Sequence, residues 1–192
     1  MARAGAAVVV VDRARFPRDK CCGDGLTASA LRHLEELGLD PADVPSWTPV
    51  REVALRSPSG RTVELGLPTD GLHAAVARRS DLDAALLHLA RDAGACVLED
   101  TAVTAVDRDG RGARVGTGRG GTFAPGYVVA ADGAWSPTRK LLGDAALAGR
   151  YLGDWHALRQ YVTGVGAEAA RQLWVWFEPD LLPGYAWSFP LG

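Results

Sequence analysis

The alternation of apolar and polar residues predicts a chain of short strands and helices. The β-branched run at 7–12 has no polar side and predicts a strand that is buried on both faces. Residues 13–26 are punctuated by proline and glycine and predict a loop. Thr27 can cap a helix that reaches about Leu37, with Gly38 as the residue that ends it.

The middle of the chain predicts a hairpin followed by a second helix. Residues 50–67 alternate around a turn at 57–60. Ser80 is the expected N-cap of the next helix, with Asp83 as its capping-box partner, and Gly94 is the expected stop. Later features are strands at 96–98 and 103–106, a hairpin over 103–130 with turns at 109–110 and 116–121, a buried strand at 127–131, and a strand at 173–177.

These elements predict an α/β fold, with an α+β mixture of layers. Aromatic residues concentrate after about residue 150, so we place a domain boundary near 145–155. The first domain, 1–150, reads as a partial Rossmann-type domain with hairpin insertions. The second, 151–192, reads as the start of an antiparallel-sheet substrate domain.

Composition and charge exclude several classes of protein. The formal net charge of −2 argues against a nucleic-acid binder, which would carry a basic excess. The apolar run near the start is too short to cross a bilayer. Three cysteines, two of them adjacent, form no disulfide framework, and the histidines stand at no metal-ligand spacing to them. A reducing, cytoplasmic location fits best.

Two local patterns bear on a nucleotide cofactor. Asp12 ends the first predicted strand. In a Rossmann unit, an acidic residue at the end of a strand accepts hydrogen bonds from the adenosine ribose. The alternative is that Asp12 has no such role, because any buried strand can end in Asp. A G-x-G-x-x-G match occurs at 116–121, but Pro125 and Gly126 follow where a helix should open. This match is therefore interpreted as a hairpin turn.

The loop at 17–26 combines glycines, cationic side chains and thiols. Gly23 and Gly25 allow backbone to approach a flat ligand, and Arg18 and Lys20 can balance phosphate charge. A plain surface loop is the alternative. An extended aromatic segment, in which Tyr185, Trp187 and Phe189 alternate, follows near the end of the sequence.

These stretches resemble signatures of the geranylgeranyl reductase family of FAD-dependent oxidoreductases, within the aromatic-hydroxylase-like flavoproteins. The loop is similar to P-R-x-K-x-C-G-x-G-L, and 183–190 is similar to Y-x-W-x-F-P. Residues 79–83 and 129–139 resemble motifs shared by the wider group. The resemblance implies FAD as cofactor, bound by Asp12, Cys22, Gly23, Gly25, Arg79, Val103 and Asp132, and a substrate cavity lined by Tyr185, Trp187 and Phe189.

The resemblance also implies an enzyme that reduces isoprenoid carbon–carbon double bonds. Its substrate would be a geranylgeranyl lipid or a menaquinone tail, and NAD(P)H or another reductant would supply electrons. Such lipid substrates are compatible with peripheral membrane contact. The catalytic proton donor is unknown, and Cys22 is a weak candidate. The alternatives are a flavin monooxygenase or halogenase of the same superfold, and a non-catalytic remnant or interaction module.

Family members carry a phosphate loop before the first strand found here and a Gly-Asp motif after the aromatic signature. The sequence contains neither at those places, so we expect a partial FAD-binding domain.

The chain by itself is therefore predicted to bind FAD weakly or not at all, because pyrophosphate recognition at a helix N-terminus is missing. Titration with FAD, followed by quenching of flavin fluorescence, measures this directly. A yellow purified sample with stoichiometric flavin would contradict the prediction.

Overall fold

The computed structural model describes residues 1–109, 112–143 and 156–191. The chain forms two compact units, each built from discontinuous stretches: Met1–Phe16 with Ala90–Asp154, and Pro17–Leu89 with Trp155–Gly192. We call them unit 1 and unit 2. The predicted domain boundary near 145–155 lies outside the described residues, as does Gly110 of the predicted turn at 109–110.

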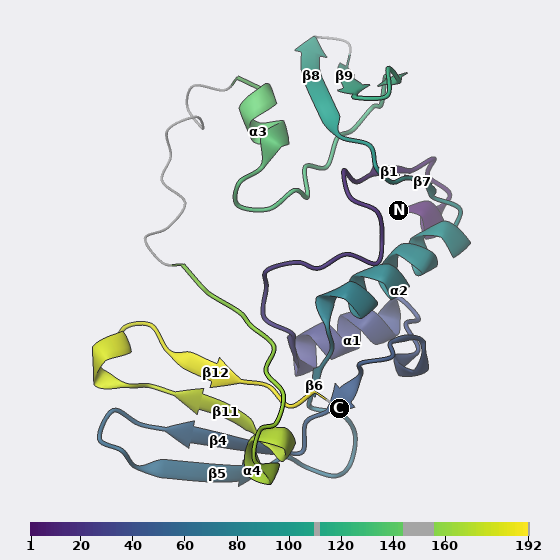
Figure 1. Ribbon diagram of the computed structural model, residues 1–192. Helices are drawn as coiled ribbons and strands as arrows, with labels where there is room; N and C mark the ends of the chain where they lie inside the picture. Colours follow the sequence, from purple (N-terminus) through teal and green to yellow (C-terminus); the bar gives the residue numbers. More distant parts are fainter. Residues whose placement is uncertain (110–111, 144–155, 192) are drawn as a thin grey trace. The chain divides into compact units, whose positions relative to one another are not determined.

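Unit 1 holds a parallel strand pair and an antiparallel meander (Figure 1). Its elements are η1 (Ala2–Ala4), β1 (Val9–Val11), β7 (Cys96–Leu98), β8 (Val103–Asp109), β9 (Gly112–Thr117), β10 (Thr122–Phe123) and α3 (Pro137–Leu141). The strand β1 pairs in parallel with β7, and β8, β9 and β10 follow one another in antiparallel order. The G-x-G-x-x-G match forms the β9–β10 turn, where Thr117 N–H donates to the Gly121 carbonyl, so the hairpin prediction is confirmed.

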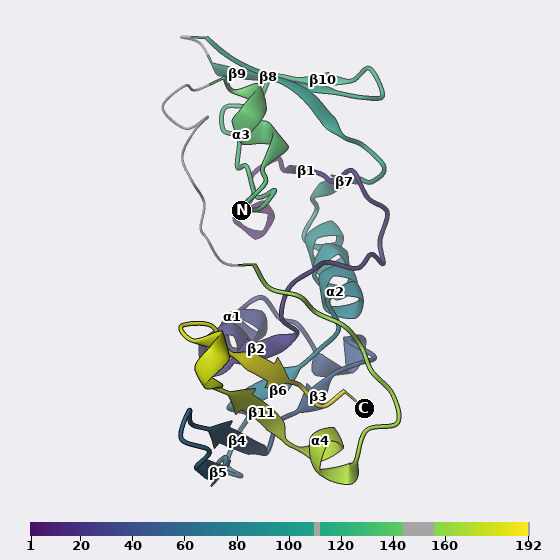
Figure 2. The same cartoon turned by 60° about the vertical axis from the view of Figure 1, so that its left-hand side comes forward.

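Unit 2 holds two sheets and the longer helices (Figure 2). Its elements are β2 (Gly25–Thr27), α1 (Ala28–Glu36), η2 (Pro41–Asp43), β3 (Thr48–Pro49), β4 (Glu52–Arg56), β5 (Thr62–Gly66), β6 (Ala74–Val76), α2 (Arg79–Asp92, whose last residues belong to unit 1), α4 (Ala167–Arg171), β11 (Leu173–Trp176), η3 (Pro179–Leu181) and β12 (Ala186–Ser188). One sheet has the order β2-β6-β3 and the other β12-β11-β4-β5. The second sheet is mixed, because β11 runs parallel to β4, whereas the pairs β11–β12 and β4–β5 are antiparallel.

The core of unit 2 lies between its helices and the β2-β6-β3 sheet. The buried cluster contains Leu39, Val44, Ala77, Leu82 and Ala85, against which leucines of α1 and α2 pack. Removal of this apolar surface from water stabilises the unit and fixes the strand β6, which leads directly into α2.

Several local predictions are confirmed. The helix α1 has Thr27 as its N-cap, and Gly38 adopts a left-handed φ of 73° just beyond its end. Such a backbone conformation favours glycine, because a Cβ would be strained there. The hairpin predicted at 50–67 is formed by β4 and β5.

The prediction of a capping box at Ser80 and Asp83 is wrong. The helix α2 already begins at Arg79, and the Ser80 hydroxyl donates to Asp81. Asp83 binds the guanidinium groups of Arg79 and Arg18 instead. Hydrogen bonds from two charged guanidinium groups stabilise a carboxylate more than a single bond from a backbone N–H does.

The prediction of a buried strand at 127–131 is also wrong. These residues form no strand, and Tyr127 and Val129 are 87% and 72% exposed. The strand β1 forms as expected but is not buried on both faces, since Val9 is 44% exposed. Within the described residues β1 pairs only with β7, and no strand pairs with 127–131. Apolar composition alone does not make a strand without a hydrogen-bonding neighbour.

Replacement of Thr27 by Ala is expected to destabilise unit 2 by about 0.5–1 kcal/mol, because the hydroxyl that accepts from Ala30 N–H is lost. Urea unfolding measures this free energy. Thr27→Ser keeps the hydroxyl and is the matched control, so an equal loss in both variants would contradict the capping role.

Candidate functional site

The loop at 17–25 is fixed on one side by charge pairs with α2. Arg18 Nη1 donates to Asp83 Oδ2 at 2.9 Å, and Arg79 Nη2 donates to Asp83 Oδ1 at 2.7 Å. Asp83 is buried, so its carboxylate depends on these donors. Two guanidinium groups thus share one carboxylate, and this trio carries a local excess of positive charge.

Arg79 also lies beside the Cys22 thiol. Burial acts to lower the pKa of Arg79, but the hydrogen bond and charge of Asp83, with a smaller contribution from Cys22, raise it above the ordinary arginine value. The guanidinium therefore stays charged next to the thiol. Two predicted site residues, Cys22 and Arg79, are brought together here.

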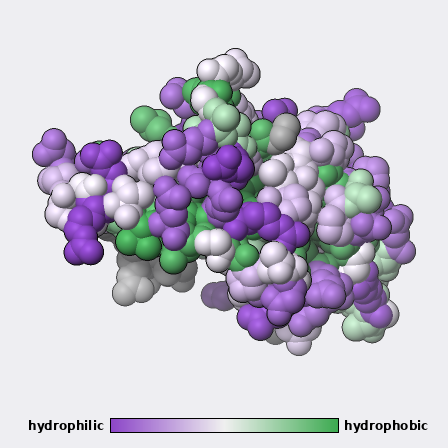
Figure 3. Space-filling view, turned by 90° about the horizontal axis from the view of Figure 1, so that it is seen from below, coloured by the Kyte–Doolittle hydropathy of each residue, from purple (hydrophilic) through white to green (hydrophobic). Residues whose placement is uncertain are grey.

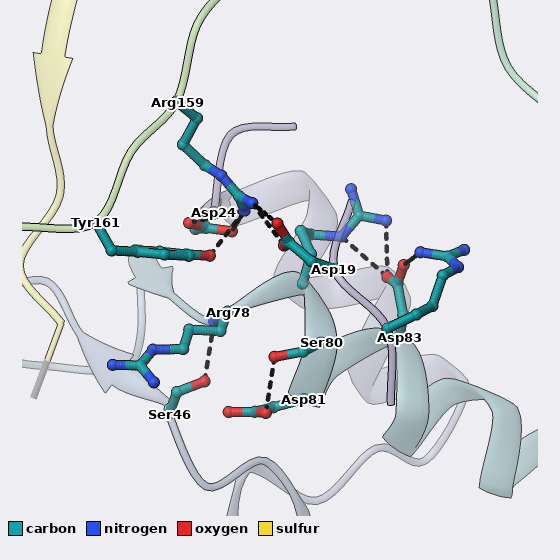
Figure 4. Close-up of polar contacts among 11 residues, drawn as sticks. Asp19, Asp24, Ser46, Arg78, Ser80, Asp81, Asp83, Arg159 and Tyr161 are labelled. Atoms are coloured by element: carbon teal, nitrogen blue, oxygen red, sulfur yellow. Dashed lines mark hydrogen bonds and ion pairs between the residues drawn. The ribbon is translucent and has the colours of Figure 1, made fainter. Parts of the chain in front are cut away.

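The other side of the loop is bound by Arg159 (Figure 4). Its Nη1 donates to Asp24 Oδ1 at 3.1 Å and to the Tyr161 hydroxyl at 2.7 Å, while its Nη2 donates to both oxygens of Asp19. The hydrogen bond from Arg159 lowers the pKa of Asp19 below its ordinary range. Burial, followed by interaction with Asp24, raises the pKa of Tyr161.

Four aromatic rings form a continuous row, which we call the aromatic ladder. Phe177 contacts Tyr185, Tyr185 contacts Trp187, and Trp187 contacts Phe189, with ring centroids 5.7, 5.8 and 6.1 Å apart. Tyr185, Trp187 and Phe189 alternate along the extended segment that contains β12 (Ala186–Ser188), which places these three rings on the same side. Phe177 follows β11 and was not predicted as part of this row.

The aromatic ladder continues into an apolar face of the four-stranded sheet. Residues directly opposite one another on paired strands share a face. By this register the face contains Val53, Leu55, Val63, Leu65, Leu173, Val175 and Trp187. Val63 and Leu65 are exposed, and Figure 3 shows hydrophobic side chains reaching the surface among polar ones.

Trp174 and Trp176 belong to the opposite face of the same sheet. Their rings stack on each other with centroids 5.4 Å apart, and both are half-buried. The stacked tryptophans therefore lie on the face of the sheet opposite to Trp187 of the aromatic ladder.

The loop and the aromatic ladder meet at Phe189. A Cβ placed on Gly25 would lie 3.1 Å from Phe189 Cζ, and one on Gly23 would lie 3.7 Å from Phe189 Cε2. Neither glycine has a positive φ, so the constraint is the space taken by the ring. The two segments that the sequence singled out thus pack directly against each other.

The remaining predicted residues lie in unit 1. Asp12 follows β1, where its side chain accepts from Ala14 N–H at 2.8 Å and its carbonyl accepts from Thr101 N–H. Val103, two residues after Thr101, begins β8. These positions place Asp12 and Val103 in the same strand-end region of unit 1.

Asp132 accepts a hydrogen bond from the first turn of α3. Its Oδ2 accepts from Thr138 N–H at 2.8 Å, and Ser136 caps the same helix, α3. Burial acts to raise the pKa of Asp132, but hydrogen bonds from Ser136 and Thr138 outweigh it and lower the pKa. Thr138 also borders a hollow whose other walls come from β8, β9 and 126–130.

Comparisons with known proteins agree with this α/β arrangement of loop and sheet. The sequence profile of the FAD-binding domain family matches residues 1–171. The chain therefore belongs to that family, whose cofactor is FAD.

Curated relatives are longer than this chain. It is 37% identical to a menaquinone reductase from Mycolicibacterium smegmatis over 211 residues, which cover 100% of this chain and 48% of that protein. It is 34% identical over 215 residues to a menaquinone reductase from Mycobacterium tuberculosis, with the same coverage. The chain thus spans about half the length of the curated relatives it matches.

Solved structures share the fold at low sequence identity. A geranylgeranyl bacteriochlorophyll reductase-like protein from Thermoplasma acidophilum has a TM-score of 0.72 at 18% identity, covering 100% of this chain and 49% of that one. A probable FAD-dependent monooxygenase from Pseudomonas aeruginosa has a TM-score of 0.64 at 22% identity, covering 91% and 48%. The expected α/β flavoprotein fold is confirmed.

Unit 2 offers features that fit an anionic, flat cofactor. Arg18 and Arg79 supply charged donors of the kind that bind phosphate, and the loop glycines already accept an aromatic ring against their backbone. Among the described residues no cluster of potential metal ligands occurs, and no helix is long and apolar enough to cross a membrane.

Replacement of Gly25 by Ala is expected to destabilise unit 2 by about 1–2 kcal/mol, because Phe189 is held by Trp187 and cannot retreat freely. Gly66→Ala is the control, since a Cβ there meets nothing within 4 Å. Urea unfolding of both variants measures the difference. Relief of the Gly25→Ala loss by Phe189→Leu would identify the ring as the cause, and a loss that persists would contradict it.

Proposed function

We propose that the protein carrying this chain is an FAD-dependent reductase of isoprenoid carbon–carbon double bonds. The observation that carries this proposal is the aromatic ladder, which ends on Gly23 and Gly25 beside the Cys22–Arg79 pair. An apolar row that ends at a charged, glycine-rich loop suits a long apolar tail whose reacting bond meets a flavin. The names of the curated relatives support a quinone tail as the substrate.

The roles of individual residues follow from their surroundings. Arg79, with Arg18 beside it, would face cofactor phosphate, while the ladder rings would hold the tail and exclude water. FAD, once reduced by NAD(P)H or another donor, would supply a hydride to one carbon of the double bond, and a proton would complete the reduction at the other. The exposed Cys22 thiol remains a candidate proton donor.

Cofactor contacts at Asp12, Val103 and Asp132 in unit 1 remain predictions, as does the division into domains at 1–150 and 151–192. NAD(P)H as electron source and peripheral contact with a membrane also belong to this proposal. Membrane contact is compatible with the lipid character of the substrate.

Trp187→Ala is expected to weaken binding of a polyprenyl quinone about tenfold, because the tail loses an aromatic contact worth about 1.4 kcal/mol. Equilibrium binding to the quinone in detergent measures the affinity. Trp135→Ala is the control, since Trp135 is an exposed tryptophan of unit 1. Equal losses in both variants, or a tail-less quinone that binds as tightly, would contradict a tail site on the ladder.

The reaction itself separates the proposal from a monooxygenase. When the protein carrying this chain is incubated anaerobically with saturating FAD and dithionite, the quinone tail should gain the mass of two hydrogens per saturated bond. Oxygen-dependent consumption of NAD(P)H with an aromatic substrate would favour the monooxygenase instead.

A further inference from the structure

The span that contains Cys22 is bracketed by two acidic residues, Asp19 and Asp24, that bind the same arginine. Arg159 lies 135 residues from Asp24 in sequence, in a segment without regular secondary structure. The side chain of Arg159 is 10% exposed and that of Asp24 is 3% exposed. This ion pair is therefore largely removed from water, unlike most surface pairs.

The fork of the guanidinium matches this arrangement. Nη1 of Arg159 donates to Asp24, and Nη2 donates to both carboxylate oxygens of Asp19 at 2.5 and 2.6 Å. A planar group with fixed donors can set the separation of two carboxylates, which a lysine ammonium does less well. The chain between Asp19 and Asp24 is thereby held at both ends.

Tyr161 supports the guanidinium from its own segment. The Arg159 Cζ lies 4.6 Å from the centroid of the Tyr161 ring, and Arg78 Cζ lies 5.5 Å from the same centroid. Arg78 directly follows Ala77, whose N–H donates to the Asp24 carbonyl at 3.0 Å. These contacts connect the end of β6 to Asp24, Asp24 to Arg159, and Arg159 through the Tyr161 ring to Arg78. Figure 4 shows Asp24, Arg159, Tyr161 and Arg78.

We propose that Arg159 is a positioning residue that holds the 17–25 loop in place, and with it the contact between Gly25 and Phe189. If the buried Asp24 carboxylate loses its charged partner, its free energy falls when the loop moves it into water. That movement would pull Gly23 and Gly25 away from the aromatic ladder. The consequence for FAD and substrate rests on the proposed function, but the effect on the loop does not.

Hydrogen exchange of the full chain, without flavin or quinone, tests the proposal. In Arg159→Gln, exchange of the Ala77 amide and of the β2 amides is expected to speed up about tenfold or more through local opening, while the β4–β5 hairpin changes by less than about twofold. The control is Arg171→Gln, which breaks an exposed pair with Glu52 in the same unit and should change none of these rates.

A second substitution distinguishes positioning from general loss of structure. Addition of Asp24→Asn to Arg159→Gln removes the uncompensated buried charge and should restore most of the Ala77 protection, a coupling that a double-mutant cycle measures. Unchanged Ala77 exchange in Arg159→Gln, or no restoration in the double variant, would overturn the proposal.

Arg159→Lys keeps the charge but lacks the fork, so it covers the case in which Arg159→Gln does not fold. Ala77 exchange intermediate between the parent and an unprotected amide is the expected result. Exchange that rises equally in the Ala77 region and in the β4–β5 hairpin would overturn the proposal. Because no ligand is present, failure here is independent of any failure to bind a quinone tail.

Discussion

The loop at 17–25 is held by paired charges, and most of the candidate site depends on that restraint. Arg18 and Asp19 are neighbours in sequence, yet one binds Asp83 of α2 and the other binds Arg159. The loop has little regular structure of its own, so ion pairs replace backbone ladders as the force that fixes it. Because Asp83 and Asp24 are buried, removal of their arginine partners would leave an uncompensated charge and is costly.

This restraint places a polar, cationic region next to an apolar one. Arg79 interacts with Cys22, which precedes Gly23 in the loop, and Phe189 packs against Gly23 and Gly25. The mixed sheet extends the apolar side, because its register gathers aliphatic residues of β4, β5 and β11 on the face that bears Trp187. Charge for a cofactor and apolar surface for a lipid tail are thus supplied by adjoining elements of a single compact unit.

Predictions from sequence succeeded where the cause is local. The cap at Thr27, the stop at Gly38 and the turn at 116–121 depend on a few neighbouring residues, and each forms as expected. They failed where a distant partner decides. Asp83 prefers two guanidinium groups to a capping role, and the apolar run at 127–131 has no strand beside it among the described residues. Composition reports the tendency of a segment but not the neighbours it will find.

The sequence by itself determined the family, the glycine-rich loop and the alternation that puts three rings on one side of β12. It carried no signal for Arg159 or Tyr161, because an arginine in an irregular segment looks like any solvated charge until its partners are known. Only the tertiary structure brought Asp19 and Asp24 to one guanidinium, added Phe177 to the aromatic ladder and set Phe189 on Gly25. The physical reason is that spacing along a chain fixes which face a side chain takes, whereas burial and ion pairing depend on residues that folding brings together.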